Sequence, residues 1–256
     1  MKNLGFKLGN VLHAIKGTKR PKTAALILAG GSGTRLGASV TKQQVKICGK
    51  SVVCHTLLAF QECPYIDEII VAAKKEEIPI YRELVKKHNI TKMKAVTVGG
   101  DDRQESAYRA FLKISDDTKF VAIHDAARCL VTPEQIRDVV TQAFACGAAI
   151  AASRAKDTVK IVESDKVKET PNRDGVWLAS TPQVIRSDIY RACIYTARKE
   201  NYKGTDDASL AEWLGFGVRV VNVGDENIKI TTPIDLALAE IIITQREKQK
   251  REEAKK

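Results

Sequence analysis

The stretch Ala24-Ala-Leu-Ile-Leu-Ala-Gly-Gly-Ser-Gly-Thr-Arg-Leu-Gly37 decides the fold, because an apolar run passes directly into a glycine-rich loop. The apolar part, Ala24–Ala29, has no polar side chain and suits a strand that is buried on both faces. Glycines let backbone N–H groups approach an anion closely, and a turn at the end of a strand makes those groups converge. The stretch therefore predicts a phosphate-binding loop, Leu28–Gly37, after the first strand.

Short apolar runs and amphipathic segments alternate along most of the chain. The expected strands are Ala24–Ala29, Glu68–Ala73, Lys94–Val98, Phe120–Ile123, Ala148–Ala152 and Val218–Val223. The expected helices are Ser51–Glu62, Glu76–His88, Arg103–Lys113, Pro133–Gly147, Ser187–Glu200, Asp206–Leu214 and Pro233–Gln245. For the fourth helix, Thr132 is placed to act as N-cap and Gly147 to end it. This order predicts an α/β fold: a Rossmann-like, mostly parallel sheet with helices on both faces.

The alternation breaks after Ala152. Two extended segments, Asp157–Ile161 and Lys166–Glu169, flank the turn-like Glu163-Ser-Asp165, and we expect a protruding β-hairpin arm at about 154–172. The polar stretch Pro171–Thr181 is expected to be a loop. We accordingly divide the chain into a basic N-terminal extension (1–22), one α/β domain (23–245) and a charged C-terminal tail (246–256).

The net charge of +11 lies mainly at the two ends of the chain. Residues 1–22 carry +6 and residues 246–256 carry +3, which leaves only +2 on the domain between them. A groove for nucleic acid would need its basic residues across the domain, so no nucleic-acid partner is expected. Within the extension, Leu4, Leu8, Val11 and Ile15 form an amphipathic helical stripe. A helix packed on the domain, or a frayed extension, is favoured over a membrane-surface or targeting helix.

Several classes of protein are excluded by what the sequence lacks. No apolar run approaches the roughly 20 residues that span a bilayer, and the first twenty residues do not resemble a secretory signal. The six cysteines show no C-x-x-C pair and no zinc-ligand spacing. We expect a cytoplasmic protein without stable membrane insertion, whose cysteines are buried free thiols.

The glycine-rich loop has to be distinguished from two other phosphate-binding loops. A Walker loop ends in Gly-Lys-Ser/Thr, whereas this loop ends in Leu36-Gly37. The dinucleotide fingerprint G-x-G-x-x-G fails because Gly37 comes one place late after Gly33. A nucleotidyltransferase loop remains, in which Arg35 and Lys42 would add positive charge beside a triphosphate.

A second cluster, His124-Asp-Ala-Ala-Arg128, ends the expected strand Phe120–Ile123. Ligands of such sheets bind beyond the carboxyl ends of the strands, so Asp125 should face the same crevice as the glycine-rich loop. A carboxylate beside a triphosphate needs a cation between them, and Mg²⁺ suits oxygen ligands. Arg128 would then hold a second phosphate. The alternative is an Asp125–Arg128 salt bridge that only closes the loop, and His124 is expected to be structural.

Nine stretches in order resemble the 2-C-methyl-D-erythritol 4-phosphate cytidylyltransferase family, from about Ala24 to Glu240. They are LAGGSGTRLG, TKQ, GGDDRQES, HDAAR, DTVK, NRDGVW, STPQ, TDDA and NIKITTPIDLALAE. The resemblance implies an enzyme that joins CTP and 2-C-methyl-D-erythritol 4-phosphate, releasing pyrophosphate, in non-mevalonate isoprenoid precursor synthesis. The domain 23–245 would then be a nucleotidyltransferase domain.

The resemblance also implies residue roles. Ala29, Gly30, Gly31 and Gly33 would bind CTP through the backbone, and Gly100, Asp101 and Ser106 would contact its cytosine and ribose. Arg35 and Lys42 would stabilise the α-phosphorus, and Asp125 would bind Mg²⁺. The second substrate would be held by Arg128, Thr158, Arg173, Thr181, Thr205 and Lys229, with Arg173 and Lys229 aiming it for attack. The family is a homodimer, so Thr158 and Arg173 on the arm would act in the partner's site.

Three positions depart from the family pattern. Thr41 replaces a proline before Lys42, and Cys129 replaces a proline after Arg128. The usual Ala-Ala-Gly opening is Ala29-Gly-Gly31, which related polyol-phosphate cytidylyltransferases also use. The first two changes remove a φ restriction, and none of the three removes a charge. The alternatives are a ribitol-5-phosphate cytidylyltransferase, against which Thr205-Asp-Asp-Ala208 argues, and a non-catalytic nucleotide-binding protein of the same fold. A dinucleotide-dependent oxidoreductase is disfavoured by the misplaced third glycine.

Overall fold

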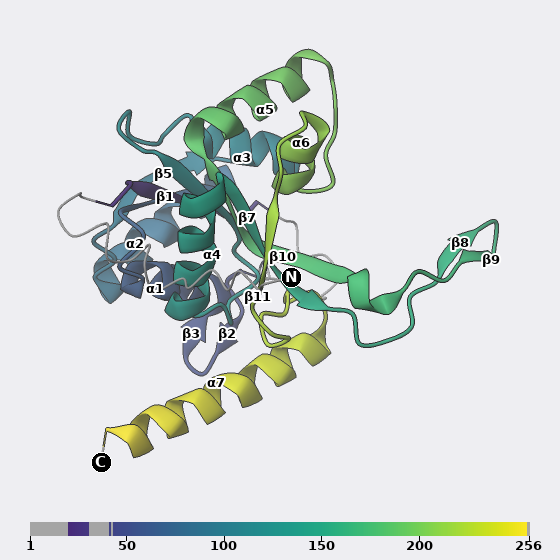
Figure 1. Ribbon diagram of the computed structural model, residues 1–256. Coiled ribbons are helices and arrows are strands. Elements are labelled where there is room, and N and C mark those ends of the chain that lie inside the picture. Colours follow the sequence, from purple (N-terminus) through teal and green to yellow (C-terminus); the bar gives the residue numbers. More distant parts are fainter. Residues whose placement is uncertain (1–19, 31–40, 42, 255–256) are drawn as a thin grey trace, which may run out of the picture.

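The computed structural model describes residues 20–30, 41 and 43–254. A central sheet of seven strands runs in the order β11-β7-β10-β6-β1-β4-β5 (Figure 1). Its strands are β1 (Thr23–Leu28), β4 (Glu68–Ala73), β5 (Met93–Val98), β6 (Phe120–Asp125), β7 (Ala148–Arg154), β10 (Trp177–Arg186) and β11 (Arg219–Asn222). All neighbouring pairs are parallel except those of β10, which runs antiparallel to β6 and β7. The expected mostly parallel α/β sheet is confirmed.

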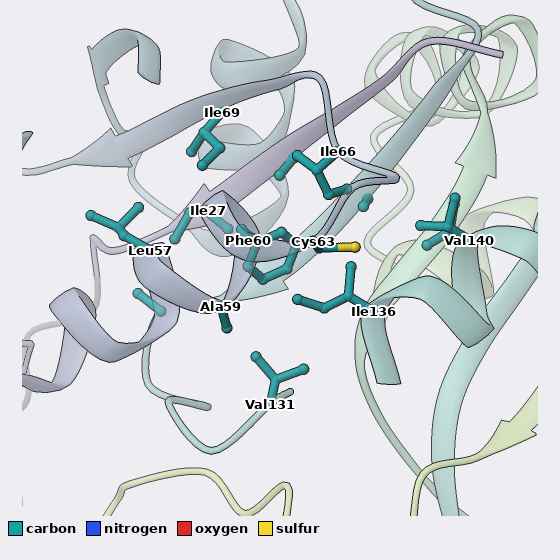
Figure 2. Close-up of a cluster of buried hydrophobic side chains, with 14 of the residues drawn as sticks. Ile27, Leu57, Ala59, Phe60, Cys63, Ile66, Ile69, Val131, Ile136 and Val140 are labelled. Carbon is teal, nitrogen blue, oxygen red and sulfur yellow. The ribbon is translucent and has the colours of Figure 1, made fainter. Parts of the chain in front are cut away.

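Helices cover both faces of the sheet. The helices are α1 (Val52–Glu62), α2 (Ile78–His88), α3 (Arg103–Phe111), α4 (Pro133–Cys146), α5 (Ser187–Lys199), α6 (Asp207–Trp213) and α7 (Pro233–Glu253). Successive strand residues point to opposite faces of the sheet. Ile27 packs in the hydrophobic cluster with α1 and α4, whereas Leu26 packs in the cluster with α3, α5 and α6. Figure 2 shows the first cluster, where Phe60 of α1 and Ile136 of α4 lie near Ile27. Burial on both faces explains why these strands read as continuous apolar runs.

Helix α4 begins and ends where its sequence predicts. The Thr132 side chain accepts from the Gln135 amide, the Gln135 side chain accepts from the Thr132 amide, and Pro133 occupies the first turn. Gly147 caps the other end with φ of 89°. Such caps satisfy backbone groups that have no partner inside the helix. Helix α7 continues to Glu253, so the charged tail is helical from residue 246 to residue 253.

Two expectations about the second half of the chain are wrong. Trp177–Arg186 is strand β10, which lies inside the sheet between β7 and β6, so the polar stretch Pro171–Thr181 is not a loop from residue 177 onward. The arm pairs β8 (Ile161–Glu163) with β9 (Lys166–Glu169), so its first strand starts where Asp157–Ile161 was expected to end. Ser164 and Asp165 between them both have positive φ, as a two-residue hairpin turn requires. The arm projects from the body beyond β7 and β10 (Figure 1).

Small features complete the chain. A short ribbon of β2 (Lys46–Ile47) and β3 (Lys50–Ser51) precedes α1, and 3₁₀ turns lie at Lys75–Glu77 and Arg173–Gly175. All six cysteines are free thiols, but only four are buried and Cys146 is exposed. Among the described helices, none combines the length and apolarity needed to cross a bilayer. The expected amphipathic helix of residues 4–15 lies outside the described residues.

Candidate active site

A cavity of about 380 Å³ lies at the carboxyl ends of the parallel strands, where the sheet topology predicts a ligand site. It is lined by Leu28, Gly30, Gln43, Gly100, Asp101, Asp102, Arg103, Ser106, Asp125, Ala127 and Lys229. The predicted site residues Gly30, Gly100, Asp101, Ser106, Asp125 and Lys229 are therefore brought together by the fold. Another cavity lies at the amino ends of β1, β4 and β6, where Arg20 pairs with Asp67 and Lys22 with Asp117. Since ligands of such sheets bind beyond the carboxyl ends of the strands, the cavity that Asp125 lines is the better candidate.

Asp125 stands at the end of β6, opposite Leu28 of β1, and both strands end at the cavity. Arg103 Nε donates to Asp125 Oδ1 at 3.0 Å, and Lys229 Nζ lies 2.8 Å from Oδ2. Burial alone would raise the pKa of Asp125, but the two cations hold that pKa well below its usual range. Asp125 is thus an ionised carboxylate at the wall of the cavity.

Arg103 is a site residue that sequence reasoning missed. It is the first residue of α3, after the N-cap Asp102, and lies within the quoted stretch GGDDRQES. Besides Asp125, its guanidinium reaches Asp207 Oδ2 at 2.6 Å, and the Tyr190 hydroxyl donates to Asp207 Oδ1 at 3.0 Å. Asp207 is almost completely buried, so Arg103 joins a buried carboxylate on α6 to the carboxylate at the cavity.

A buried chain of hydrogen bonds supports Asp125 from behind. His124 Nε2 lies 3.1 Å from the Arg128 carbonyl, which can only accept, so this nitrogen carries the proton. Thr181 Oγ1 therefore donates to His124 Nδ1 at 3.0 Å and accepts from the Asp125 amide at 3.1 Å. Burial lowers the pKa of His124 to about 3, which keeps the ring neutral. The bonds agree with the predicted structural role of His124.

The segment that carries Lys229 is tied to the turn after β6. Arg128 Nη1 donates to the Asn227 carbonyl at 2.9 Å, and the Ile230 amide donates to the Ala127 carbonyl at 2.8 Å. The Asn227 side chain in turn donates to the Thr181 carbonyl at 2.8 Å. The alternative of an Asp125–Arg128 salt bridge is wrong, because Asp125 pairs with Arg103 and Lys229. The Arg128 guanidinium instead holds the lysine-bearing segment in place.

The loop before α3 requires a glycine at position 100. A Cβ at Gly100 would lie only 2.0 Å from Glu105 Cγ, so any side chain would displace the first turn of the helix. Ser106 Oγ accepts from the Gly100 amide at 3.0 Å and donates to the Asp102 carbonyl at 2.8 Å. Ser106 therefore shapes this wall of the cavity, while Asp101 is exposed at its rim.

The other predicted site residues lie elsewhere. Ala29 is buried beside the cavity, and its amide donates to the Ala72 carbonyl. Thr158 and Arg173 are exposed on the arm, and Thr205 is exposed just before α6. Arg173 Nη1 donates to the Lys156 carbonyl within the arm. The predicted phosphate-binding residues Gly31, Gly33, Arg35 and Lys42 lie outside the described residues.

The residues at the cavity fit a divalent cation that is shared with a ligand. Within residues 20–30, 41 and 43–254, no three His, Cys, Asp or Glu side chains are grouped to hold a metal. Mg²⁺ usually binds through one or two carboxylates, several waters and substrate phosphates, not through a cage of protein ligands. Asp125 offers one ionised oxygen ligand of the kind that Mg²⁺ prefers.

Comparison with known proteins identifies the family. Residues 23–245 match the sequence profile of the 2-C-methyl-D-erythritol 4-phosphate cytidylyltransferases. A cytidylyltransferase of that name from Geotalea uraniireducens is 42% identical over 225 residues, which cover 87% of this chain and 97% of the relative. The chain belongs to this family. It is therefore a nucleotidyltransferase, as the glycine-rich loop predicted.

Other relatives agree with membership in the cytidylyltransferase family. The enzyme from Syntrophus aciditrophicus is 41% identical over 230 residues, covering 89% of this chain and 98% of the relative. The solved 4-diphosphocytidyl-2C-methyl-D-erythritol synthase of Anaerococcus prevotii superposes with a TM-score of 0.78 at 28% identity. That superposition covers 88% of this chain and 99% of the known structure, so the match extends over the whole fold.

Proposed function

We propose that the chain transfers the cytidylyl group of CTP to 2-C-methyl-D-erythritol 4-phosphate and releases pyrophosphate, in the methylerythritol phosphate route to isoprenoid precursors. The observation that carries this proposal is the charged cluster of Asp125, Lys229 and Arg103 at the cavity, in a chain from this family. The nucleotide would lie between the glycine-rich loop and the loop of Gly100 and Asp101. Gly30, Gly31 and Gly33 would then contact its phosphates, and Ala29, whose amide donates to the Ala72 carbonyl, would hold the start of the loop in place.

The reaction needs charge cancellation and alignment more than proton transfer. A phosphate oxygen of the second substrate attacks the α-phosphorus of CTP, the bond to the bridging oxygen breaks, and pyrophosphate leaves. Because the nucleophile is already an anion, no strong general base is required. The buried, neutral His124 fits this mechanism, since both its ring nitrogens are committed to the protein.

The cations have separate roles in this proposal. Arg35 and Lys42 would stabilise the negative charge that develops around the α-phosphorus, and Lys229 would orient the attacking phosphate. Nucleotidyltransferases generally use a divalent metal, and Asp125 is its proposed ligand here. Bound Mg²⁺ would neutralise triphosphate charge. Arg128 and Thr181 would form the floor of the second-substrate site, because their hydrogen bonds already fix the chain around Asp125.

The arm is the part of the chain that we propose to act in the active site of a second subunit. Thr158 and Arg173 are exposed on the arm and do not line the cavity, so they would reach substrate in a homodimer, from the partner chain. Apolar side chains exposed on the arm, Ile161, Val162 and Val167, suit burial against that partner. Thr205, exposed before α6, would complete the pocket for the hydroxyl groups.

Pyrophosphate release tests the proposal most directly. Each of the four ribonucleoside triphosphates is combined with 2-C-methyl-D-erythritol 4-phosphate or ribitol 5-phosphate. The expected result is turnover with CTP and the methylerythritol substrate. Preference for ribitol 5-phosphate would show that the proposed second substrate is wrong. CTP binding without pyrophosphate release would show that the chain binds the nucleotide but does not catalyse transfer.

Two substitutions in the glycine-rich region make the same assay sharper. Arg35→Ala and Lys42→Ala should each fold normally and lose on the order of 10²–10³ in kcat, because each removes a preorganised charge. Lys46→Ala is the matched control, since Lys46 is an exposed lysine nearby in β2. Near-normal turnover of either test variant would overturn the assignment of these residues.

A further inference from the structure

The charges in direct ion-pair contact around Asp125 balance within the protein. Asp125 and Asp207 contribute two negative charges, and Arg103 and Lys229 contribute two positive charges within hydrogen-bonding distance of them. Each Asp125 oxygen already has a cationic partner, Oδ1 in Arg103 and Oδ2 in Lys229. A free divalent cation would therefore approach a carboxylate whose charge is cancelled, with two like charges beside it.

The two cations differ in how firmly the protein holds them. Arg103 is fixed from both sides, because its guanidinium also binds Asp207, whose side chain is only 1% exposed. Lys229 is held by one contact: within the part of the chain that the structure describes, Asp125 is its only side-chain partner. The Lys229 side chain is 39% exposed and ends at the cavity. A lysine ammonium is a point charge on a flexible stem, whereas an arginine fork has a fixed geometry.

We infer that Lys229 is a stand-in for the divalent cation in the nucleotide-free protein. It occupies Asp125 Oδ2 until a metal–nucleotide complex arrives, and then turns to the substrate phosphates in the cavity, where it can orient the attacking one. Arg103 stays on Oδ1 and keeps the carboxylate oriented. The inference rests on the proposed nucleotidyl transfer. It adds that metal and nucleotide enter together, since the nucleotide phosphates carry the metal and also bring negative charge that takes Lys229 from Asp125.

The affinity of the full chain for Mn²⁺ in the absence of nucleotide tests this inference. Electron paramagnetic resonance measures the concentration of free Mn²⁺ during the titration. Lys229→Met should bind Mn²⁺ at least about tenfold more tightly than the wild type, because a like charge beside the ion is gone. Lys229→Arg retains the charge and should show no gain. In Lys229→Met with Asp125→Asn, the gained site should disappear.

Lys203→Met is the matched control. Lys203 also pairs with a cavity-lining carboxylate, that of Asp102, and its removal should create no Mn²⁺ site. Thermal unfolding of each variant checks that the fold is kept, which is expected because both lysines are exposed to solvent.

Two outcomes would overturn the inference. In the first, the wild type without nucleotide binds Mn²⁺ as tightly as Lys229→Met does. In the second, Lys229→Met gains no Mn²⁺ site that depends on Asp125. The proposed function is tested separately by pyrophosphate release from the wild type. Its failure, with the Mn²⁺ gain intact, would refute nucleotidyl transfer and leave Lys229 as a cation stand-in.

Discussion

Acidification from pH 8 to pH 5 should weaken the fold through His124. The ring is completely buried, packs against Phe60 with ring centroids 4.9 Å apart, and has a pKa lowered to about 3 by burial. In the unfolded chain the same group titrates near 6.5. Below pH 6.5 the His124 ring is therefore protonated in the unfolded state but stays neutral in the folded state. The free energy of unfolding falls as the pH falls.

The size of the effect follows from the distance between the two pKa values. Each pH unit between 6.5 and 3 removes about 1.4 kcal/mol, so His124 alone should cost about 2 kcal/mol between pH 8 and pH 5. Asp125 acts with the same sign, because its folded pKa is also depressed, but its contribution is lost only below about pH 4, where the unfolded carboxyl is protonated. His55, whose pKa burial also lowers, adds to the loss with the same sign.

Urea-induced unfolding at pH 8, 7, 6 and 5 measures this dependence for the wild type and His124→Gln. Gln retains an N–H donor for the Arg128 carbonyl but has no titration in this range. Its unfolding free energy should depend much less on pH, whatever its stability at pH 8. His55→Gln is the matched control and should keep the part of the slope due to His124. A His124→Gln variant with the slope of the wild type would refute the reasoning.

Three further predictions concern the walls of the cavity. Gly100→Ala should weaken CTP binding in calorimetry because its Cβ meets Glu105, whereas Gly175→Ala, with no atom within 4 Å of its Cβ, should leave binding unchanged. Arg103→Lys should lower kcat about 10- to 100-fold with little change in melting temperature, and an unchanged kcat would remove Arg103 from the site. Thr181→Val should lower the unfolding free energy by about 2–4 kcal/mol, because two buried groups lose partners; a loss below about 1 kcal/mol in urea unfolding would contradict the hydrogen-bond chain.

The parallel part of the fold could be predicted because its strands are buried on both faces and its helices carry strong end signals. The exception is β10, whose Ser180-Thr-Pro-Gln183 resembles a loop. Pro182 has no N–H for the ladder, and the pairing with β7 shifts register between Ala179 and Gln183. Its buried polar groups find partners far away in sequence: the Gln183 side chain donates to Asp206 and accepts from the Ala208 amide.

The site could be predicted only where its residues adjoin recognisable elements. Asp125 ends a buried strand, and the topology places it beside Leu28, the first residue of the glycine-rich stretch. Arg103 was missed because an arginine in the first turn of a helix is ordinary in sequence. Its partner Asp207 lies 104 positions away and its other partner, Asp125, is 22 positions away. Only the folded chain brings the two carboxylates to one guanidinium.

The antiparallel strand β10 also sets the order in which the sheet can be completed during synthesis. β6 pairs with β1 on one side, but its other neighbour, β10, is made only after β7 and the arm have emerged. Until Arg186 is available, β6 is an open edge with buried-type side chains on both faces, and such edges recruit other chains. Pairing between distant segments is also slow. The arm therefore lengthens the time for which a nascent chain carries an aggregation-prone edge.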